Sequence, residues 1–200
     1  VFAKRCLELE YTDTATPKDV SKVFDEGFED IAFHEHSTAE GLSKQTRSVI
    51  SRDLTPYLTR LLQGAHNNES DIEFHTDVLK KFDAFRLLSP HRRGALGVDG
   101  LNKEAETILK QTFDEDDLKM GAKFYIGRPI LIRQNDYTQK LFNGDVGIVV
   151  DKKKVAFPDA DEGVRYVSTS RLPRHETVYA MTIHSSQGSE FAHAMVVLPA

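Results

Sequence analysis

The chain has 200 residues, of which 40% are apolar and 28% charged, and its formal net charge is −5 at pH 7. This composition excludes intrinsic disorder as the default and provides the apolar surface for one globular domain or two small ones. No segment approaches the ~20 apolar residues of a membrane helix, and the N-terminus lacks the pattern of a secretory signal. The single cysteine, Cys6, excludes an internal disulfide and favours a reducing, cytoplasmic location. Because the chain opens without methionine and inside an amphipathic pattern, we expect it to be part of a longer protein.

Residues 1–81 predict a mostly helical lead-in. Helices are expected at 2–10 and after Thr16, where a capping threonine precedes a proline in the first turn. A short strand is expected at 31–36, on composition alone.

Residues 41–63 place apolar side chains at mostly helical spacing and predict a helix that ends at Gly64. Pro56 is expected to break or restart this helix near Thr55, because proline has no N–H to donate. A polar loop at 65–71 and a short helix at 75–82 follow.

The next segment has the order of an α/β core. A buried strand is predicted at 84–90, a glycine-rich loop at 91–100 and a helix at about 100–113. Strand, glycine-rich loop and helix in this order are typical of proteins that handle nucleotides or nucleic acids. The loop is not a Walker A loop, because no Gly-Lys-Ser/Thr follows it.

Short β-type runs separated by Gly, Pro, Asn and Asp then predict a small all-β barrel. The runs are 127–137, 141–151, 153–159 and 163–173. Residues 128–154 carry six Lys/Arg against three Asp/Glu, and such a local basic surface can hold phosphates even in an acidic chain. The alternative for the three lysines at 152–154 is a solvated hairpin tip.

Two runs at 176–184 and 192–200 return to the composition of buried strands. We therefore predict an α/β domain formed by 1–114 and 176–200, with an all-β domain inserted at 115–175.

The segment TIHSSQGSEF, residues 182–191, is polar although apolar runs flank it. A strand that ends there delivers its last side chains to the carboxyl edge of the sheet, where open α/β sheets bind ligands. Gly188 permits φ values that other residues resist, and Phe191 is expected to return the loop to the core. The alternative is a serine-rich turn whose polar groups bond to one another, and the residue types alone leave both interpretations open.

The pattern T-x-H-x-x-Q-G-x-E-F in this segment resembles motif V of superfamily-1 DNA helicases. Residues 170–199 are similar to the RecD-type helicases, the alpha subunits of exodeoxyribonuclease V. Residues 127–149 are similar to the barrel of those proteins, and 85–102 to the segment that enters their second motor domain. The resemblance covers about residues 82–200 and implies part of a RecA-like second motor domain with an inserted barrel of the Src-homology-3 type.

The resemblance also implies two sets of binding residues. In this family, the threonine and histidine of motif V lie against single-stranded DNA, and the Q-G-x-E portion faces ATP. The DNA-binding candidates here are Thr182, His184 and Ser185, and the ATP-binding candidates are Gln187, Gly188 and Glu190. Ser185 departs from the family, which usually has a lysine there, and a hydroxyl lacks the phosphate-seeking charge of that lysine.

Further DNA-binding candidates are implied in the glycine-rich region and in the barrel. They are Ser89, His91, Asn102, Arg133 and Tyr137. Tyr137 offers a plane on which a base can stack. The alternative for the glycine-rich region is an ordinary connection with solvated arginines, and Asn135 and Asn143 are interpreted as shaping turns.

No metal site is predicted. His34 and His36 would share one face of an extended segment, but no third ligand is evident nearby. The acidic run at 114–117 is interpreted as a solvated connector. No Ser-His-Asp order and no C-x-x-C motif supports other catalysis.

The expected function is part of an ATP-dependent 5′→3′ DNA helicase, the RecD-type subunit of exodeoxyribonuclease V, acting in double-strand-break repair and recombination. ATP, Mg²⁺, single-stranded DNA and the beta and gamma subunits of that enzyme are the implied cofactors and partners. The 200 residues contain no Walker A loop, magnesium-binding acidic pair or arginine motif, so we expect no ATP hydrolysis by this chain alone. The alternatives are a non-catalytic DNA- or protein-binding module and a stand-alone superfamily-1 helicase without nuclease partners.

Overall fold

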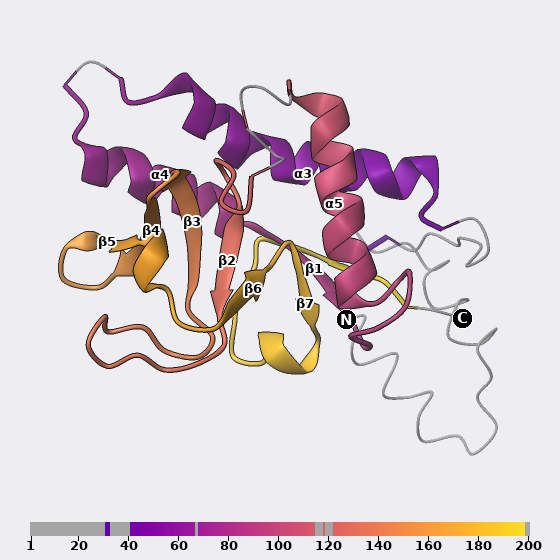
Figure 1. The fold of residues 1–200 in the computed structure, drawn as a ribbon. Coiled ribbons are helices and arrows are strands. Elements are labelled where there is room, and N and C mark those ends of the chain that lie inside the picture. Colours follow the sequence, from indigo (N-terminus) through magenta and orange to yellow (C-terminus); the bar gives the residue numbers. More distant parts are fainter. Residues whose placement is uncertain (1–30, 33–40, 67, 115–117, 119–121, 199–200) are drawn as a thin grey trace. The chain divides into compact units, whose positions relative to one another are not determined.

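The computed structural model describes residues 31–32, 41–66, 68–114, 118 and 122–198 (Figure 1). The described residues from 41 onward belong to one compact unit, Thr38–Ala200. The helices predicted at 2–10 and after Thr16, together with Cys6 and the two histidines of the HEH segment, lie outside the described residues. The strand predicted at 31–36 is described only at its first two residues, which have no regular secondary structure.

A three-stranded parallel sheet confirms the predicted α/β layer. Strand β1 (Phe85–Ser89) is central, with β7 (Ala180–Thr182) and β8 (His193–Val196) parallel to it on either side. All five residues of β1 are buried, as the apolar run at 84–90 predicts. Helix α5 (Val98–Thr112) follows β1 after the glycine-rich loop, close to the predicted bounds of 100–113.

Two further helices form a hairpin before the sheet. Helix α3 (Lys44–Gln63) begins at an N-capping Ser43, and helix α4 (Asp71–Asp83) begins with a capping box between Ser70 and Glu73. The prediction that Pro56 breaks α3 near Thr55 is wrong, because the helix runs continuously through the proline. A proline removes one backbone donor, whereas the buried side chains on both sides of it keep the whole helix packed on the core.

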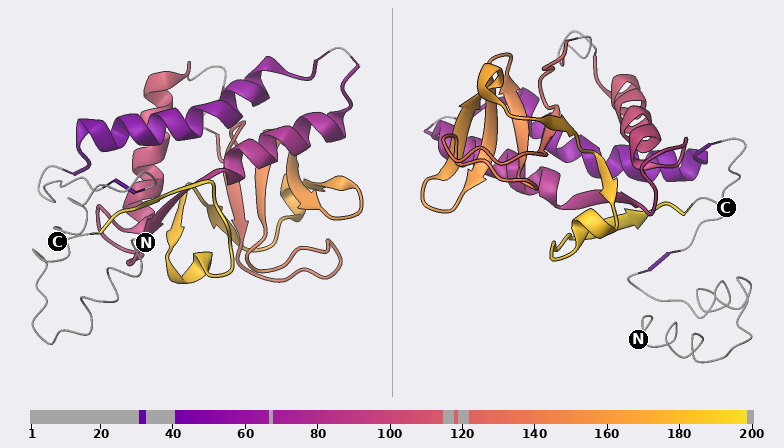
Figure 2. Two further views of the ribbon diagram at one scale, coloured as in Figure 1. Left: turned by 180° about the vertical axis from the view of Figure 1, so that it is seen from behind. Right: turned by 60° about the horizontal axis from the view of Figure 1, so that its bottom comes forward.

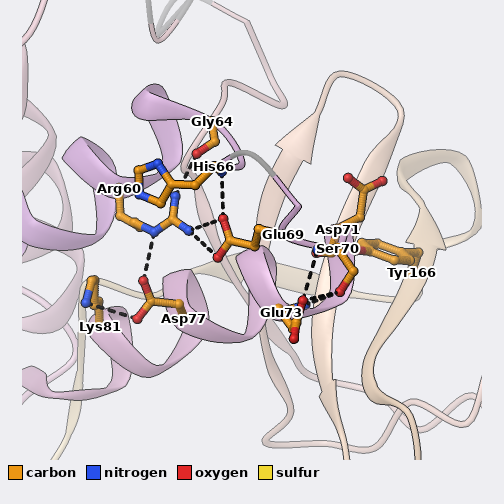
Figure 3. Close-up of polar contacts among 10 residues, drawn as sticks. All are labelled: Arg60, Gly64, His66, Glu69, Ser70, Asp71, Glu73, Asp77, Lys81 and Tyr166. Atoms are coloured by element: carbon orange, nitrogen blue, oxygen red, sulfur yellow. Dashed lines mark hydrogen bonds and ion pairs between the residues drawn. The ribbon is translucent and has the colours of Figure 1, made fainter.

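A buried arginine joins the two helices of this hairpin (Figure 3). The Arg60 guanidinium donates to Glu69 at 2.6 Å, to Asp77 at 2.8 Å and to the Gly64 carbonyl at 2.7 Å. It also lies 4.4 Å from the centre of the Phe74 ring. Only 6% of Arg60 is exposed, so these partners take the place of the water that the cation loses.

The second sheet is antiparallel. Its strands are β2 (Pro129–Ile132), β3 (Val146–Asp151), β4 (Lys154–Asp159), β5 (Gly163–Ser168) and β6 (His175–Thr177). Their spatial order is β5-β4-β3-β2-β6, and the four predicted β runs supply β2 to β5. The expected domain boundaries at 115 and 175 stay a prediction.

The prediction of a closed barrel is wrong, because the edge strands β5 and β6 do not pair with each other. Strand β5 is instead held against α4, where the Tyr166 hydroxyl donates to the Asp71 carbonyl at 3.1 Å and lies 2.7 Å from Nδ1 of His75. At the other edge, β6 pairs only with β2 and the chain then passes into β7. Alternating apolar residues do not distinguish a closed barrel from an open sheet covered by a helix.

One large hydrophobic cluster joins buried residues of both sheets and of the three helices, and two smaller clusters lie beside it. Helix α4 packs on β3, β4 and β5, and the view from behind shows α3 and α4 together on that side (Figure 2). Three buried hydroxyls extend this core: Tyr57 lies 3.4 Å from Tyr179, which lies 3.1 Å from Tyr125. Tyr57 also donates to the Gly127 carbonyl at 3.0 Å, at the entry to the antiparallel sheet, and Tyr125 donates to Glu106 on α5 at 2.7 Å.

The contact between His75 and Tyr166 gives a pH-dependent stability. Burial lowers the pKa of His75 below its ordinary value of 6.5, so the unfolded chain binds a proton more readily than the folded one. His75 therefore contributes stability that is fully present above pH 6.5 and is lost as the pH falls through the folded pKa.

We expect His75→Gln, which does not titrate, to reduce the drop in unfolding free energy between pH 7.5 and pH 5.5. Urea unfolding of both proteins at the two pH values measures this. Carboxylates also titrate in this range, but they are common to both proteins and affect both alike. Equal decreases in the unfolding free energy of the two proteins would therefore contradict the prediction.

None of the helices in the part of the chain that the structure describes combines the length and the apolar character needed to cross a membrane.

Candidate functional site

The polar segment 182–191 lies at the carboxyl edge of the parallel sheet, as predicted from the sequence. The Ile183 N–H donates to the Ser89 carbonyl at 3.1 Å, so the end of β7 is fixed beside the end of β1. A single 3₁₀ turn, His184–Ser186, follows the strand. This segment and the loop between β2 and β3 lie together at the lower edge in Figure 1.

The hydroxyl groups of the segment bond within it. The Thr182 hydroxyl accepts from the Ser185 N–H at 3.1 Å and lies 2.8 Å from the Ser185 hydroxyl. The Ser186 hydroxyl donates to the Ile183 carbonyl at 2.8 Å. These contacts agree with the alternative interpretation of the segment, a serine-rich turn whose polar groups bond to one another. They stabilise the conformation of the turn.

The larger polar side chains of the segment behave differently. His184, Gln187 and Glu190 are exposed, and no hydrogen bond or ion pair joins their side chains to another residue in the described part of the chain. Gly188 has φ +81°, with no atom within 4 Å of the place a Cβ would take. The glycine is therefore required for its backbone conformation, as predicted, and not for lack of space.

A groove of about 330 Å³ lies between this segment and the antiparallel sheet. The segment contributes His184, Ser185, Ser189 and Phe191, and the antiparallel sheet with its β2–β3 loop contributes Leu131, Arg133, Asn143, Gly144 and Val146. Asp83, Arg86 and Met181 complete the lining. Three of the predicted DNA-binding residues, His184, Ser185 and Arg133, thus come together from two different sheets.

Arg86 is a charged groove residue that the sequence did not single out. Only 1% of it is exposed, and its guanidinium lies over the rings of Phe82 and Phe191, at 4.4 and 5.3 Å from their centres. It donates to Asp83 at 2.9 Å and to the Val178 carbonyl at 3.3 Å, while its Nε has no partner in the described structure. Burial lowers the pKa of Arg86, and the carboxylate of Asp83, which lines the same groove, balances the charge of this cation.

The second arginine of the groove is more accessible. A third of the Arg133 side chain is exposed (33%), and its Nε lies 3.7 Å from Glu176 on β6. Glu176 also accepts from Arg92 at 2.8 Å, and this hydrogen bond raises the pKa of Arg92. One carboxylate therefore serves two arginines beside the groove.

Two of the predicted residues flank the glycine-rich loop, Ser89 at the end of β1 and Asn102 on α5. Ser89 is fully buried, and its hydroxyl donates to the Leu96 carbonyl at 2.9 Å. The Asn102 side chain accepts from the backbone N–H groups of Tyr179 and Ala180 at 2.7 and 3.0 Å, and donates to the Val98 carbonyl at 3.0 Å. The Ser89 hydroxyl therefore stabilises the glycine-rich loop, and the Asn102 side chain joins α5 to the chain that enters β7.

The remaining predicted residues are exposed but do not line the groove. The side chain of His91 lies on the surface of the loop after β1. Tyr137 is 77% exposed on the loop between β2 and β3. Gln187, Gly188 and Glu190 lie on the same segment as His184 but outside the groove lining.

No cluster of three or more metal-binding side chains occurs in the described residues.

No protein-family model matches the chain. It is 40% identical over 137 residues to the RecBCD enzyme subunit RecD of Haemophilus influenzae, a match that covers 66% of this chain and 20% of that protein. The subunit RecD of Mycolicibacterium smegmatis is 39% identical over 163 residues, which are 78% of this chain and 26% of that protein. The ATP-dependent RecD2 DNA helicase of Deinococcus radiodurans is 29% identical over 117 residues, covering 58% of this chain and 16% of that protein.

The chain thus spans about a fifth to a quarter of the length of these RecD subunits. The resemblance noted in the residues of the parallel-sheet loop and of the antiparallel sheet extends over most of the chain. By this partial homology, the chain is related to the RecD and RecD2 superfamily-1 DNA helicases.

Proposed function

We propose that this chain is part of an ATP-dependent 5′→3′ DNA helicase of the RecD type, in which it binds single-stranded DNA and forms one wall of the ATP site. The observation that carries the proposal is the groove that His184 and Ser185 share with Arg133 across the two sheets. Homology to RecD subunits and to a RecD2 DNA helicase supports the same assignment.

The groove has the chemistry of a phosphodiester site. Arg133 supplies accessible positive charge, Arg86 is paired with Asp83 in the same lining, and Ser189 and Asn143 supply neutral donors. Contacts of this kind fix the position of a nucleic-acid backbone and carry no sequence information. Ser185 stands where the family usually has a lysine, so it offers no positive charge to a phosphate. Arg133 is then the accessible cation of the groove that attracts the phosphate.

The ATP-facing role belongs to Gln187, Gly188 and Glu190. The side chains of Gln187 and Glu190 have no hydrogen-bond partner among the described residues, and Gly188 between them has a positive φ. These residues fit one wall of a nucleotide site. They do not fit a complete one, because the chain has no Walker A loop to hold the phosphates. When the complete protein binds ATP with Mg²⁺, hydrolysis of the ATP would supply the free energy and the metal ion would neutralise the charge of the phosphates.

One short segment then contacts DNA through His184 and nucleotide through Gln187 and Glu190. Two ligands on one small element are coupled whenever that element changes its arrangement with the state of one of them. The cytoplasmic setting, the repair and recombination role and the beta and gamma partner subunits belong to this proposal through the RecD homology.

Arg133→Gln in the complete protein tests the proposed DNA groove. The expected result is an affinity for oligothymidylate about five- to tenfold weaker at low salt, with the slope of log K against log salt reduced by about one. Fluorescence anisotropy of a labelled oligonucleotide at several salt concentrations measures both. Lys103→Gln, on the exposed face of α5, removes the same charge away from the groove and is the matched control. Equal losses in the two variants, or no binding by the unmodified protein at low salt, would reject the groove as a DNA site.

A non-catalytic interaction module is the second candidate. The hydroxyls of Thr182, Ser185 and Ser186 bond within their own turn, which favours it. A Walker A loop upstream and an arginine motif downstream in the same protein select the helicase. A complete protein that carries neither selects the module.

A further inference from the structure

The loop between β2 and β3 exposes two aromatic rings that touch each other. Tyr137 is 77% exposed and Phe142 46%, and their ring centres lie 6.0 Å apart at an interplanar angle of 76°. Within the described part of the chain, these are the two large aromatic side chains that are exposed to this degree. We propose that Tyr137 and Phe142 form a stacking platform for an unpaired nucleobase, next to the groove that takes the phosphodiester backbone.

The loop is braced so that the rings stay exposed. Asp136 accepts from the backbone N–H groups of Thr138 and Gln139 at 3.0 and 3.1 Å, and it forms a two-way backbone bridge with Leu141. Leu141 is fully buried in the core of the antiparallel sheet and anchors the loop next to Phe142. The loop therefore has a fixed shape that holds its rings in water, against the hydrophobic effect.

The bracing continues on the other side of Phe142. Its N–H donates to Asp145 at 2.8 Å, and the next N–H, of Asn143, donates to Asn135 at 2.7 Å. The Asn135 side chain thus shapes the turn, as the sequence predicts. The Asn143 side chain makes no hydrogen bond within the described structure and lines the groove.

Phe142 precedes Asn143 and Gly144, both of which line the groove with Arg133 and His184. A strand whose phosphate lies in the groove therefore brings the base of a neighbouring nucleotide to the rings. Aromatic faces bind any base in this way, because every base has a π-face, so the platform adds affinity without sequence preference. Stacking needs an unpaired base, which excludes a fully paired duplex as the ligand of this platform.

The proposal rests on the function proposed above and adds contacts to the bases, which phosphate binding does not require. Oligothymidylate and an abasic oligomer of the same length distinguish base contacts from phosphate contacts. The two oligomers share all their phosphates and differ only in the bases. Anisotropy with both oligomers is measured for the complete protein and for Tyr137→Ala and Phe142→Ala. Leu62→Ala, which trims an exposed apolar side chain on α3, is the control for loss of surface apolar area.

We expect the unmodified protein and Leu62→Ala to bind oligothymidylate roughly tenfold more tightly than the abasic oligomer. In Tyr137→Ala and Phe142→Ala this preference should fall to about twofold, with unchanged affinity for the abasic oligomer. Phe142→Leu, which keeps the apolar bulk without the ring, should lose the preference as well and guards against a misfolded loop.

Equal losses of affinity for both oligomers in the aromatic variants, or no preference in the unmodified protein, would overturn the platform and leave the DNA groove standing. If the unmodified protein bound neither oligomer, the groove and the platform would fall together.

Discussion

Gln187→Ala or Glu190→Ala in the complete protein is expected to lower DNA-stimulated ATP hydrolysis by roughly 100-fold and to leave the affinity for single-stranded DNA within about twofold. The reason is their place in the turn. Both side chains are exposed and lie outside the groove, so they are free for a nucleotide and contribute nothing to the proposed DNA site.

His184→Ala is the matched variant on the same turn. Its side chain lines the groove, so its loss should weaken DNA binding several-fold and slow ATP hydrolysis only where DNA is not saturating. ATPase rates measured over a range of DNA concentrations, together with anisotropy, separate the two patterns. Equal loss of both activities in all three variants would show that the turn acts as one structural unit and would refute the division of roles.

Arg60→Ala is expected to lower the Tm of the protein by roughly 5–10 °C. The substitution leaves Glu69 and Asp77 without the cation that joins them, at the point where α3, the following loop and α4 meet. It also removes the guanidinium that lies over the Phe74 ring. Thermal unfolding followed by circular dichroism measures the change.

Lys81→Ala is the control for Arg60→Ala, because Lys81 pairs with the same carboxylate of Asp77 at 3.0 Å but is 40% exposed. Its loss should change the Tm by less than about 2 °C, since exposed ion pairs contribute little. Similar shifts in the two variants would mean that burial of the arginine does not strengthen its contacts.

The sequence predicted most of the local structure because the signals for it are local. The buried run at 84–90 became β1, the glycine-rich stretch became the loop before α5, and the polar segment after the next buried run lies at the carboxyl edge of the sheet. The proline in α3 shows the limit of such signals. Local chemistry predicts a break at Pro56, but burial of the residues on both sides outweighs the loss of one hydrogen bond.

The open second sheet has the same origin. An alternating pattern of apolar residues states that a strand has a buried face but not what covers that face. Helix α4 covers the antiparallel sheet here, and the sheet remains open. The DNA contacts that the resemblance implies for Ser89 and Asn102 stay a prediction, and the tertiary structure adds the hydrogen bonds that these two side chains make to Leu96, Tyr179 and Ala180.

The sequence by itself determined the element order, the polar turn between two buried strands and the family resemblance, because each depends on residues close together in the chain. Only the tertiary structure decided which side chains share a site. Arg133 and His184 are far apart in sequence and line one groove because β6 leads directly from the antiparallel sheet into β7. The tertiary structure also decided that Arg86 is buried beneath the groove and that Phe142 is exposed beside it. The burial of a side chain depends on the elements that pack around it.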